Sequence, residues 1–309
     1  LKMAQEVDDS HILFVVHGIG DHTRRLKDIE PLLQKNRDEL IHKLGIHKKV
    51  HIIPIEWHTA LRDQTIEADK ILETVTPPGL EFLRRFTNHT LIDVFYFQSP
   101  QYRELFYQEA SIQLNTNFAN FLSQRSNWKG KVSILAHSLG SVICFDLLCN
   151  QLRDTNEDGN ISYWRKNRAN QESVTSQPTQ YEYEKEGKKV SCNLGKPLTE
   201  PLRDDFPQLL FCVENLFLIG SPLSLFMAVR GDHNNKALVP HCTNIYNIIH
   251  PYDPVSYRIE PLIHTCFTPL EPVTLKHHAT GGARTHINLM NKMKSIGFGW
   301  QTKPENDNN

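Results

Sequence analysis

Ser138 lies where a serine hydrolase places its nucleophile. The apolar run that ends at Ala136 predicts a buried strand, and the apolar segment that begins at Leu139 predicts a helix, so the serine falls on a sharp strand-to-helix turn. Such a turn needs small neighbours, which Ala136 and Gly140 supply, although the usual pattern has glycine at the first of them. The turn would expose Ser138 Oγ and aim the N–H group of Leu139 at an oxyanion. We interpret the segment as a nucleophile elbow rather than as a serine that falls by chance between a strand and a helix.

A second candidate loop follows another predicted strand, 11–16, in the segment His17-Gly-Ile-Gly. A loop of this kind upstream of the elbow supplies the second oxyanion donor in lipases and esterases, so we predict that the N–H group of Gly18 or Ile19 has this role. The alternative is a phosphate-binding loop, but the segment lacks both G-x-G-x-x-G and the Lys-Ser or Lys-Thr pair of a P-loop. We interpret His17 as a residue that fixes the loop rather than as a catalytic base.

Asp253 is the candidate acid of a catalytic triad. It follows a predicted strand, 244–250, in a turn bracketed by Pro251 and Pro254. The acid of an α/β-hydrolase comes after the serine in the chain and before the histidine, on a turn after a late strand. There it holds the correct tautomer of the histidine and stabilises the imidazolium. The alternative is an Asp that only caps the turn, which is an ordinary role for Asp before Pro.

Several further motifs join these three in one order along the chain, from about His11 to about His286. The motifs are the elbow Ser-Leu-Gly-Ser, the strand followed by His-Gly-Ile-Gly, Pro54-Ile-Glu-Trp57, Leu91-Ile-Asp-Val94, Leu218-Ile-Gly-Ser-Pro-Leu223 and His250-Pro-Tyr-Asp-Pro-Val-Ser-Tyr-Arg258. In this order they give the chain a resemblance to the DDHD-domain intracellular phospholipase A1 family. The resemblance implies an α/β-hydrolase-type core with Ser138 as nucleophile. It also implies that Asp253 is the acid, as the first residue of the quartet that gives the family its name.

The triad base is not identified by the resemblance, because the later Asp, His and Asp of the quartet have no match in this chain. The internal candidates are His250, His264, His277, His278 and His286. Of these, His286 best fits the chain order Ser, Asp, His. We therefore expect the chain to be truncated at its C-terminal end and to be a poor hydrolase by itself.

The composition excludes several classes of protein. The net charge of −1 gives no nucleic-acid-binding footprint, and no apolar run is long enough to span a membrane. The chain does not open with a charged and then apolar signal segment. Six cysteines without regular spacing predict buried thiols in a reducing compartment rather than a disulfide framework. Sixteen histidines are scattered without metal-ligand spacing, so we predict no metal, and serine catalysis requires no cofactor.

Apolar segments alternate with helical patterns along the chain, which predicts an α/β fold with a mostly parallel sheet and helices on both faces. The predicted strands are 11–16, 50–56, 131–136, 214–219 and 244–250, and the clearest helices are 26–44 and 102–121. Pro54 favours an edge position for the second strand or a bulge in it. We divide the chain into an N-terminal part of the hydrolase core (1–150), a disordered polar insertion (151–205), the remainder of the core (206–290) and a polar tail (291–309).

Two hypotheses about function follow. The first is serine-dependent hydrolysis of glycerophospholipid esters, of the phospholipase A1 type, with a neutral-glyceride lipase as a close variant; the lipid substrate is what the resemblance implies. The second is a non-catalytic membrane-trafficking adaptor with a trafficking protein as partner, because the family includes a member associated with a vesicle coat. For either one we expect a cytoplasmic protein that binds intracellular membranes peripherally. The oligomeric state is not predicted.

Overall fold

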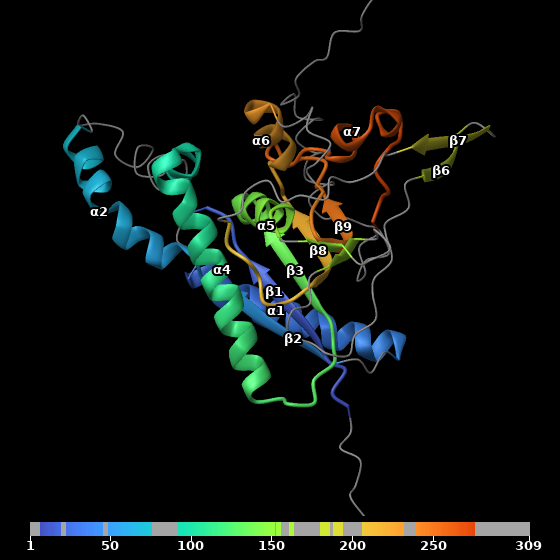
Figure 1. Ribbon diagram of the computed structural model, residues 1–309, viewed down its shortest axis with the longest axis horizontal. Coiled ribbons are helices and arrows are strands. Elements are labelled where there is room, and N and C mark those ends of the chain that lie inside the picture. The colour runs from blue at the N-terminus through green and yellow to red at the C-terminus, as the bar shows by residue number, and fades with distance from the viewer. Residues whose placement is uncertain are drawn as a thin grey trace, which may run out of the picture. The chain divides into compact units, whose positions relative to one another are not determined.

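Five apolar segments form one parallel sheet in the computed structural model of the chain (Figure 1). The strands are β1 (His11–Val16), β2 (Val50–Ile55), β3 (Val132–His137), β8 (Val213–Ile219) and β9 (Cys242–Ile248), in the spatial order β2-β1-β3-β8-β9. All four pairings are parallel. Each strand lies within two residues of a predicted one, so the α/β prediction is confirmed. Pro54 lies in β2 at the edge of the sheet, where β1 is the only described strand paired with it and an absent N–H group costs least.

The structure describes residues 7–19, 23–45, 49–75, 92–151, 153–155, 161–163, 180–185, 188–193, 206–231 and 239–275. The chain divides into two compact units, Leu1–Thr268 and Pro269–Asn309. The sheet and all described helices belong to the first unit. The described part of the second unit, 269–275, contains no helix or strand.

The helices follow the strands in alternation. They are α1 (Thr23–Leu44), α2 (His58–Val75), α4 (Pro100–Ser123), α5 (Leu139–Cys149), α6 (Leu223–Arg230) and the short α7 (Glu260–Ile263), and residues 92–98 are also helical. The helix α5 is buried along nearly its whole length, from Leu139 to Cys149, because it packs against β1 and β3 on one side and against α4 and α6 on others. This explains why its sequence is apolar all round rather than striped.

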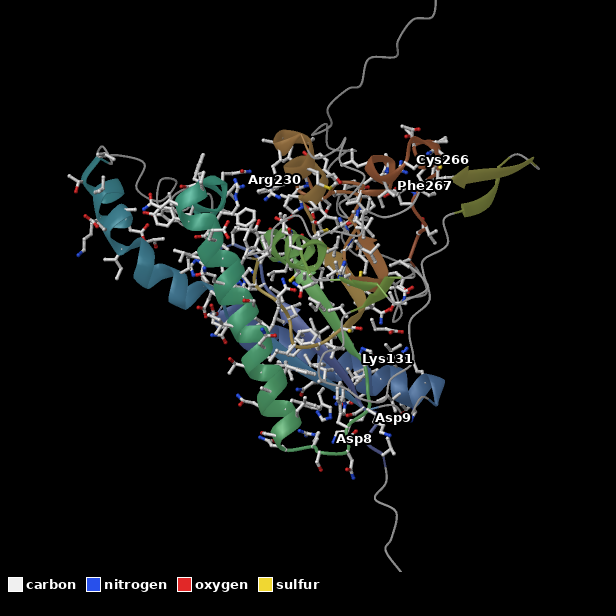
Figure 2. The ribbon with its side chains drawn as sticks, in the orientation of Figure 1. Asp8, Asp9, Lys131, Arg230, Cys266 and Phe267 are labelled. Carbon is white, nitrogen blue, oxygen red and sulfur yellow. The ribbon has the colours of Figure 1, made fainter. Side chains whose placement is uncertain are left out.

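The order of the strands predicts where a ligand would bind. The connection after β1 leads to β2, which lies on one side of β1 in the sheet. The strands β3, β8 and β9 follow one another on the other side of β1. With right-handed connections, α1 therefore lies on the opposite face from α4, α5 and α6. In such sheets the ligand crevice lies at the carboxyl ends of the two strands where the direction of winding changes. Here these strands are β1 and β3, which end at the His17-Gly-Ile loop and at Ser138. Lys131 precedes β3 and Asp8 precedes β1, at the opposite end of the sheet (Figure 2).

Two short antiparallel pairs lie within the predicted insertion 151–205. They are β4 (Arg153–Thr155) with β5 (Ile161–Tyr163), and β6 (Gln180–Lys185) with β7 (Lys188–Asn193); neither pair joins the central sheet. The two ends of the insertion are fastened to each other. The side chain of Gln151 donates to Pro207 O at 3.1 Å and accepts from Leu209 N–H at 2.7 Å, and Gln208 Nε2 donates to Asn150 O at 3.0 Å.

Deleting residues 155–200 and bridging the gap with a short Gly/Ser linker is expected to leave the melting temperature nearly unchanged. The reason is that the bonds around Gln151 close the loop without the insertion. The matched variant adds Gln151→Ala to the deletion, which leaves the buried Leu209 N–H without its acceptor and should lower the melting temperature. Thermal unfolding followed by circular dichroism measures both. A fall of more than about 10 °C on deletion alone, a few kcal/mol for a chain of this size, would place the insertion in the core.

The cysteines agree with the predicted buried thiols at three positions and depart from the prediction at two. Cys144, Cys149 and Cys242 are buried free thiols, and burial raises the pKa of Cys242 to about 12. Cys212 is a free thiol but is exposed. Cys266, labelled in Figure 2, is disulfide-bonded, so the prediction of a buried free thiol is wrong for this residue. Scattered spacing along a sequence gives no information on which residues the fold brings together.

Candidate active site

The backbone of Ser138 has the conformation of a sharp strand-to-helix turn. Its φ is 52° and its ψ is −126°, and among the described residues it is the one non-glycine residue with a positive φ. This conformation costs a serine about 1–3 kcal/mol and persists only where the surroundings impose it. Two hydrogen bonds contribute: Ser138 N–H donates to Ile219 O at 3.0 Å, and Ser141 N–H donates to Ser138 O at 3.0 Å. Strain stored at one serine, at the carboxyl end of a central strand, is typical of a functional position.

Two glycines allow the His17-Gly-Ile loop to touch the elbow. A Cβ atom on Gly18 would lie 2.5 Å from Ser138 Cβ and 3.1 Å from Ser138 Oγ, and one on Gly140 would lie 2.2 Å from His17 O. Real Cβ atoms do not come this close, so both positions exclude any side chain. The structure thus brings Gly18 directly beside the hydroxyl group of Ser138. Ala136, the departure from the usual motif, is fully buried within β3.

His17 holds the loop through its ring and its carbonyl group. The ring is buried and stacks on Trp57 with centroids 4.8 Å apart. Its Nδ1 donates to Gly18 O at 2.8 Å, because a carbonyl oxygen only accepts, and Trp57 Nε1 donates to His17 O at 3.1 Å. In a trans peptide the C=O and the following N–H point in opposite directions. The anchored Gly18 carbonyl therefore directs the N–H of Ile19 away from the ring of His17.

The stacked tryptophan is fixed in its turn by a buried His–Asp pair. The ring of His58 contacts Trp57 edge-on, with centroids 5.6 Å apart, and His58 Nε2 lies 3.0 Å from Asp93 Oδ2. His58 and Asp93 are both buried. The motifs around Trp57 and Asp93, which are far apart in sequence, thus converge on the loop that lies beside Ser138.

Leu139, the other predicted oxyanion donor, follows the serine directly. It is the first residue of α5 and is buried. The N–H groups in the first turn of a helix have no carbonyl partner within the helix and carry the positive end of its dipole. An oxyanion that develops at a carbonyl attacked by Ser138 Oγ would meet this helix terminus.

Asp253 lies in the turn after β9, as predicted, and both oxygens of its carboxylate are hydrogen-bonded. Val255 N–H donates to Oδ1 at 2.9 Å and Ser256 Oγ donates to Oδ2 at 2.5 Å. Partial burial acts to raise its pKa, but these two donors, with the nearby His137 and His250, hold the pKa below the ordinary value of 3.8. Asp253 is therefore a carboxylate at neutral pH, as a residue that orients a histidine must be.

Replacing Ser256 by alanine is expected to raise the pKa of Asp253 toward 3.8, because the carboxylate loses a donor. A carboxyl with a depressed pKa stabilises the fold above its unfolded pKa and loses this contribution as the pH falls through the folded pKa. The loss of unfolding free energy in Ser256→Ala should therefore be present at pH 7 and shrink below about pH 4. Urea unfolding at pH 7 and pH 3 measures it. The control is Ser123→Ala, whose hydroxyl donates to a backbone carbonyl and should have the same effect at both values. If Ser256→Ala lowered the free energy of unfolding equally at pH 7 and pH 3, the proposed role of Ser256 in lowering the pKa of Asp253 would be contradicted.

His137 is a site residue that the sequence analysis missed. It precedes the nucleophile and lies beside the acid: a Cβ on Gly220, whose φ is 57°, would be 3.4 Å from His137 Nε2 and 3.2 Å from Asp253 Oδ2. Among the predicted base candidates, His250 and His264 have local roles, because their Nδ1 atoms accept from Tyr252 N–H and Cys266 N–H. His277, His278 and His286 lie outside the described residues, so the structure does not place a base beside Ser138.

In the part of the chain that the structure describes, no cluster of three or more His, Cys, Asp or Glu side chains is arranged to hold a metal ion. Within the same residues, no helix is both long enough and apolar enough to cross a bilayer.

Comparison with known proteins finds a matching domain model and several curated relatives of the chain. Residues 209–305 match the model of the DDHD domain. The chain is 32% identical to mouse "Phospholipase DDHD1" over 88% of its own length and 52% of the relative. It is 28% identical to mouse "Triacylglycerol hydrolase DDHD2" over 90% of its own length and 50% of the relative. A third relative is mouse "SEC23-interacting protein", 24% identical, with coverage of 93% of the chain and 43% of the relative. The chain thus spans about half the length of these relatives, and no solved structure matches it significantly.

Proposed function

Because the chain belongs to the DDHD-domain family, we propose that it is a carboxylic ester hydrolase that acts on glycerolipids with Ser138 as nucleophile. The single observation that supports this most is the contact of Gly18 with Ser138 at the carboxyl ends of β1 and β3. This contact supports the proposal because it puts the loop that contains Ile19 beside a strained serine whose next residue, Leu139, begins a helix.

In the proposed mechanism, Ser138 Oγ attacks the ester carbonyl and forms a tetrahedral intermediate. The N–H groups of Leu139 and Ile19 stabilise its oxyanion; such preorganised donors contribute about 3–4 kcal/mol each to transition-state stabilisation. A histidine, for which His286 is the candidate, removes the proton of Ser138, and Asp253 orients that histidine. The leaving alcohol takes the proton, and water then hydrolyses the acyl-enzyme by the same route.

We propose a glycerophospholipid as the substrate, cleaved as by a phospholipase A1 at the sn-1 ester. The name of the DDHD1 relative supports a phospholipid, and the name of the DDHD2 relative supports a triacylglycerol as the alternative. The reaction would take place on intracellular membranes, to which the protein would bind peripherally from the cytoplasm.

The substrate assignment is tested with two lipid preparations presented to the same chain. One is a phosphatidylcholine vesicle whose sn-1 and sn-2 acyl chains differ, and the other is a triacylglycerol emulsion. Release of the sn-1 acid from the vesicle is the expected result, and the identity of the released acid is read by mass spectrometry. Release from the emulsion alone would replace the phospholipid by a neutral glyceride, and His286→Ala tests the proposed base in the same assay.

A membrane-trafficking adaptor remains the second candidate, favoured by the similarity to a protein named for its interaction with SEC23. An adaptor has no use for a strained serine beside a glycine loop. A fluorophosphonate probe separates the two functions, because it labels an activated serine and leaves an unactivated one unchanged.

A further inference from the structure

The carbonyl group of Ser138 is held by a side chain as well as by the backbone. Ser141 Oγ donates to Ser138 O at 2.5 Å and lies 2.6 Å from Ser221 Oγ. Ser221 Oγ also accepts from Leu223 N–H at 3.2 Å. Ser141 and Ser221 are each completely buried, so water does not replace either hydroxyl.

The direction of each hydrogen bond in this series follows from which atoms carry a proton to donate. Ser138 O only accepts, so the single proton of Ser141 Oγ is committed to it. The proton between the two hydroxyl groups therefore comes from Ser221, and Ser221 in turn accepts from Leu223 N–H. The result is a directed relay from Leu223 N–H through Ser221 and Ser141 to the carbonyl of Ser138. Each bond in such a chain polarises and strengthens the next.

The relay ends on the peptide that carries an oxyanion donor. Ser138 C=O and Leu139 N–H belong to one trans peptide, so they point in opposite directions. Fixing the carbonyl on Ser141 therefore fixes the N–H of Leu139 on the opposite side. The relay also opposes the relaxation of the strained φ and ψ of Ser138.

Gly220 and Ser221, which form a corner after β8, also contact the turn that carries Asp253, called the acid loop below. Ser221 O accepts from Tyr257 N–H at 3.1 Å, and Gly220 lies against the carboxylate of Asp253. The corner at Gly220 and Ser221 follows β8, which lies between β3 and β9. It therefore contacts both the element that carries the nucleophile and the element that carries the acid.

We propose that Ser141 and Ser221 are positioning residues for the ester hydrolase: their relay sets the direction of the Leu139 N–H group, and Ser221 fastens the acid loop to the elbow. This inference rests on the proposed function. Neither serine touches substrate, so their effect is on the rate of acylation and not on binding.

The test uses Ser141→Ala, Ser221→Ala and the double variant, with a fluorophosphonate as probe. The labelling rate at saturating probe and the half-saturating concentration are measured separately, beside the melting temperature. We expect the saturated rate to fall about 100-fold, as when an oxyanion donor is lost, with the half-saturating concentration little changed. The double variant should be about as slow as the slower single variant, because both act through one relay.

Ser133→Ala is the matched control. Ser133 is a buried hydroxyl on β3 that accepts from Asn215 Nδ2 at 2.9 Å and lies 2.8 Å from His11 Nε2, but it is near the amino end of the strand. Its loss should lower the melting temperature as much as the loss of Ser141 without changing the labelling rate. If an alanine variant does not fold, Ser141→Cys, which keeps a weak donor of similar size, should label at an intermediate rate.

Two results would overturn the inference alone: a relay variant that labels at the wild-type rate, or a Ser133 variant that is slowed as much. A wild-type chain that does not label at all would overturn the proposed function, and the inference with it.

Discussion

In a form of the protein with a complete triad, replacing Ser138 by alanine is expected to lower kcat for lipid-ester hydrolysis by about a million-fold, the typical cost of losing a triad serine. The fold should remain, because alanine keeps the Cβ atom that packs beside Gly18, and the N–H and C=O groups through which Ser138 forms its hydrogen bonds belong to its backbone and are unchanged. Fatty-acid release and circular dichroism measure the two effects.

The control for this change is Ser123→Ala, which removes an exposed hydroxyl at the end of α4 and should change neither quantity. A Ser138 variant that keeps more than about a tenth of wild-type turnover would remove this residue from the mechanism, because removal of the nucleophile in a triad leaves far less.

Gly18→Ala is expected to have the next largest effect on catalysis. The added methyl group would meet Ser138 Cβ at 2.5 Å, so either the elbow or the loop must shift. A shift of the loop misplaces the N–H group of Ile19, and a shift of the elbow misplaces Ser138 Oγ. Loss of one oxyanion donor costs about 100- to 1000-fold in kcat, and we expect at least this loss.

The matched variant is Gly231→Ala at the C-terminal end of α6. This glycine has a φ of 79° but no atom within 4 Å of an added Cβ, so the variant carries backbone strain without a clash. It should lower stability by about 1 kcal/mol and leave kcat unchanged. If Gly18→Ala retains kcat within about threefold of wild type, the loop does not form part of the oxyanion site, since loss of a donor costs far more.

The central strands of the sheet were predictable from the sequence because they are largely buried. Such strands appear as continuous apolar runs, so β1, β3 and β8 were located to within a residue or two. The elbow was predictable for a similar reason: a strand, a serine with small neighbours and an apolar helix are consecutive in the sequence, and the structure adds the positive φ of Ser138.

Contacts made through space were not predictable in the same way. His137 and Asp253 both lie against Gly220, and Ser141 contacts Ser221, only because β8 lies between β3 and β9. A sequence gives each of these residues but not the order of the strands that brings them together. The stack of His17 on Trp57 depends in the same way on the pairing of β1 with β2. His286 remains a candidate from chain order alone.

The most direct test of the central claim is to map the site at which a fluorophosphonate reacts with the intact chain. The probe forms a stable bond only with a serine that is activated as a nucleophile and whose oxyanion is stabilised. Mass spectrometry of the digested protein should find one adduct, on the peptide that contains Ser138, and none in Ser138→Ala. An adduct on another serine, or an unmodified wild-type chain, would contradict the assignment of Ser138 as the catalytic nucleophile.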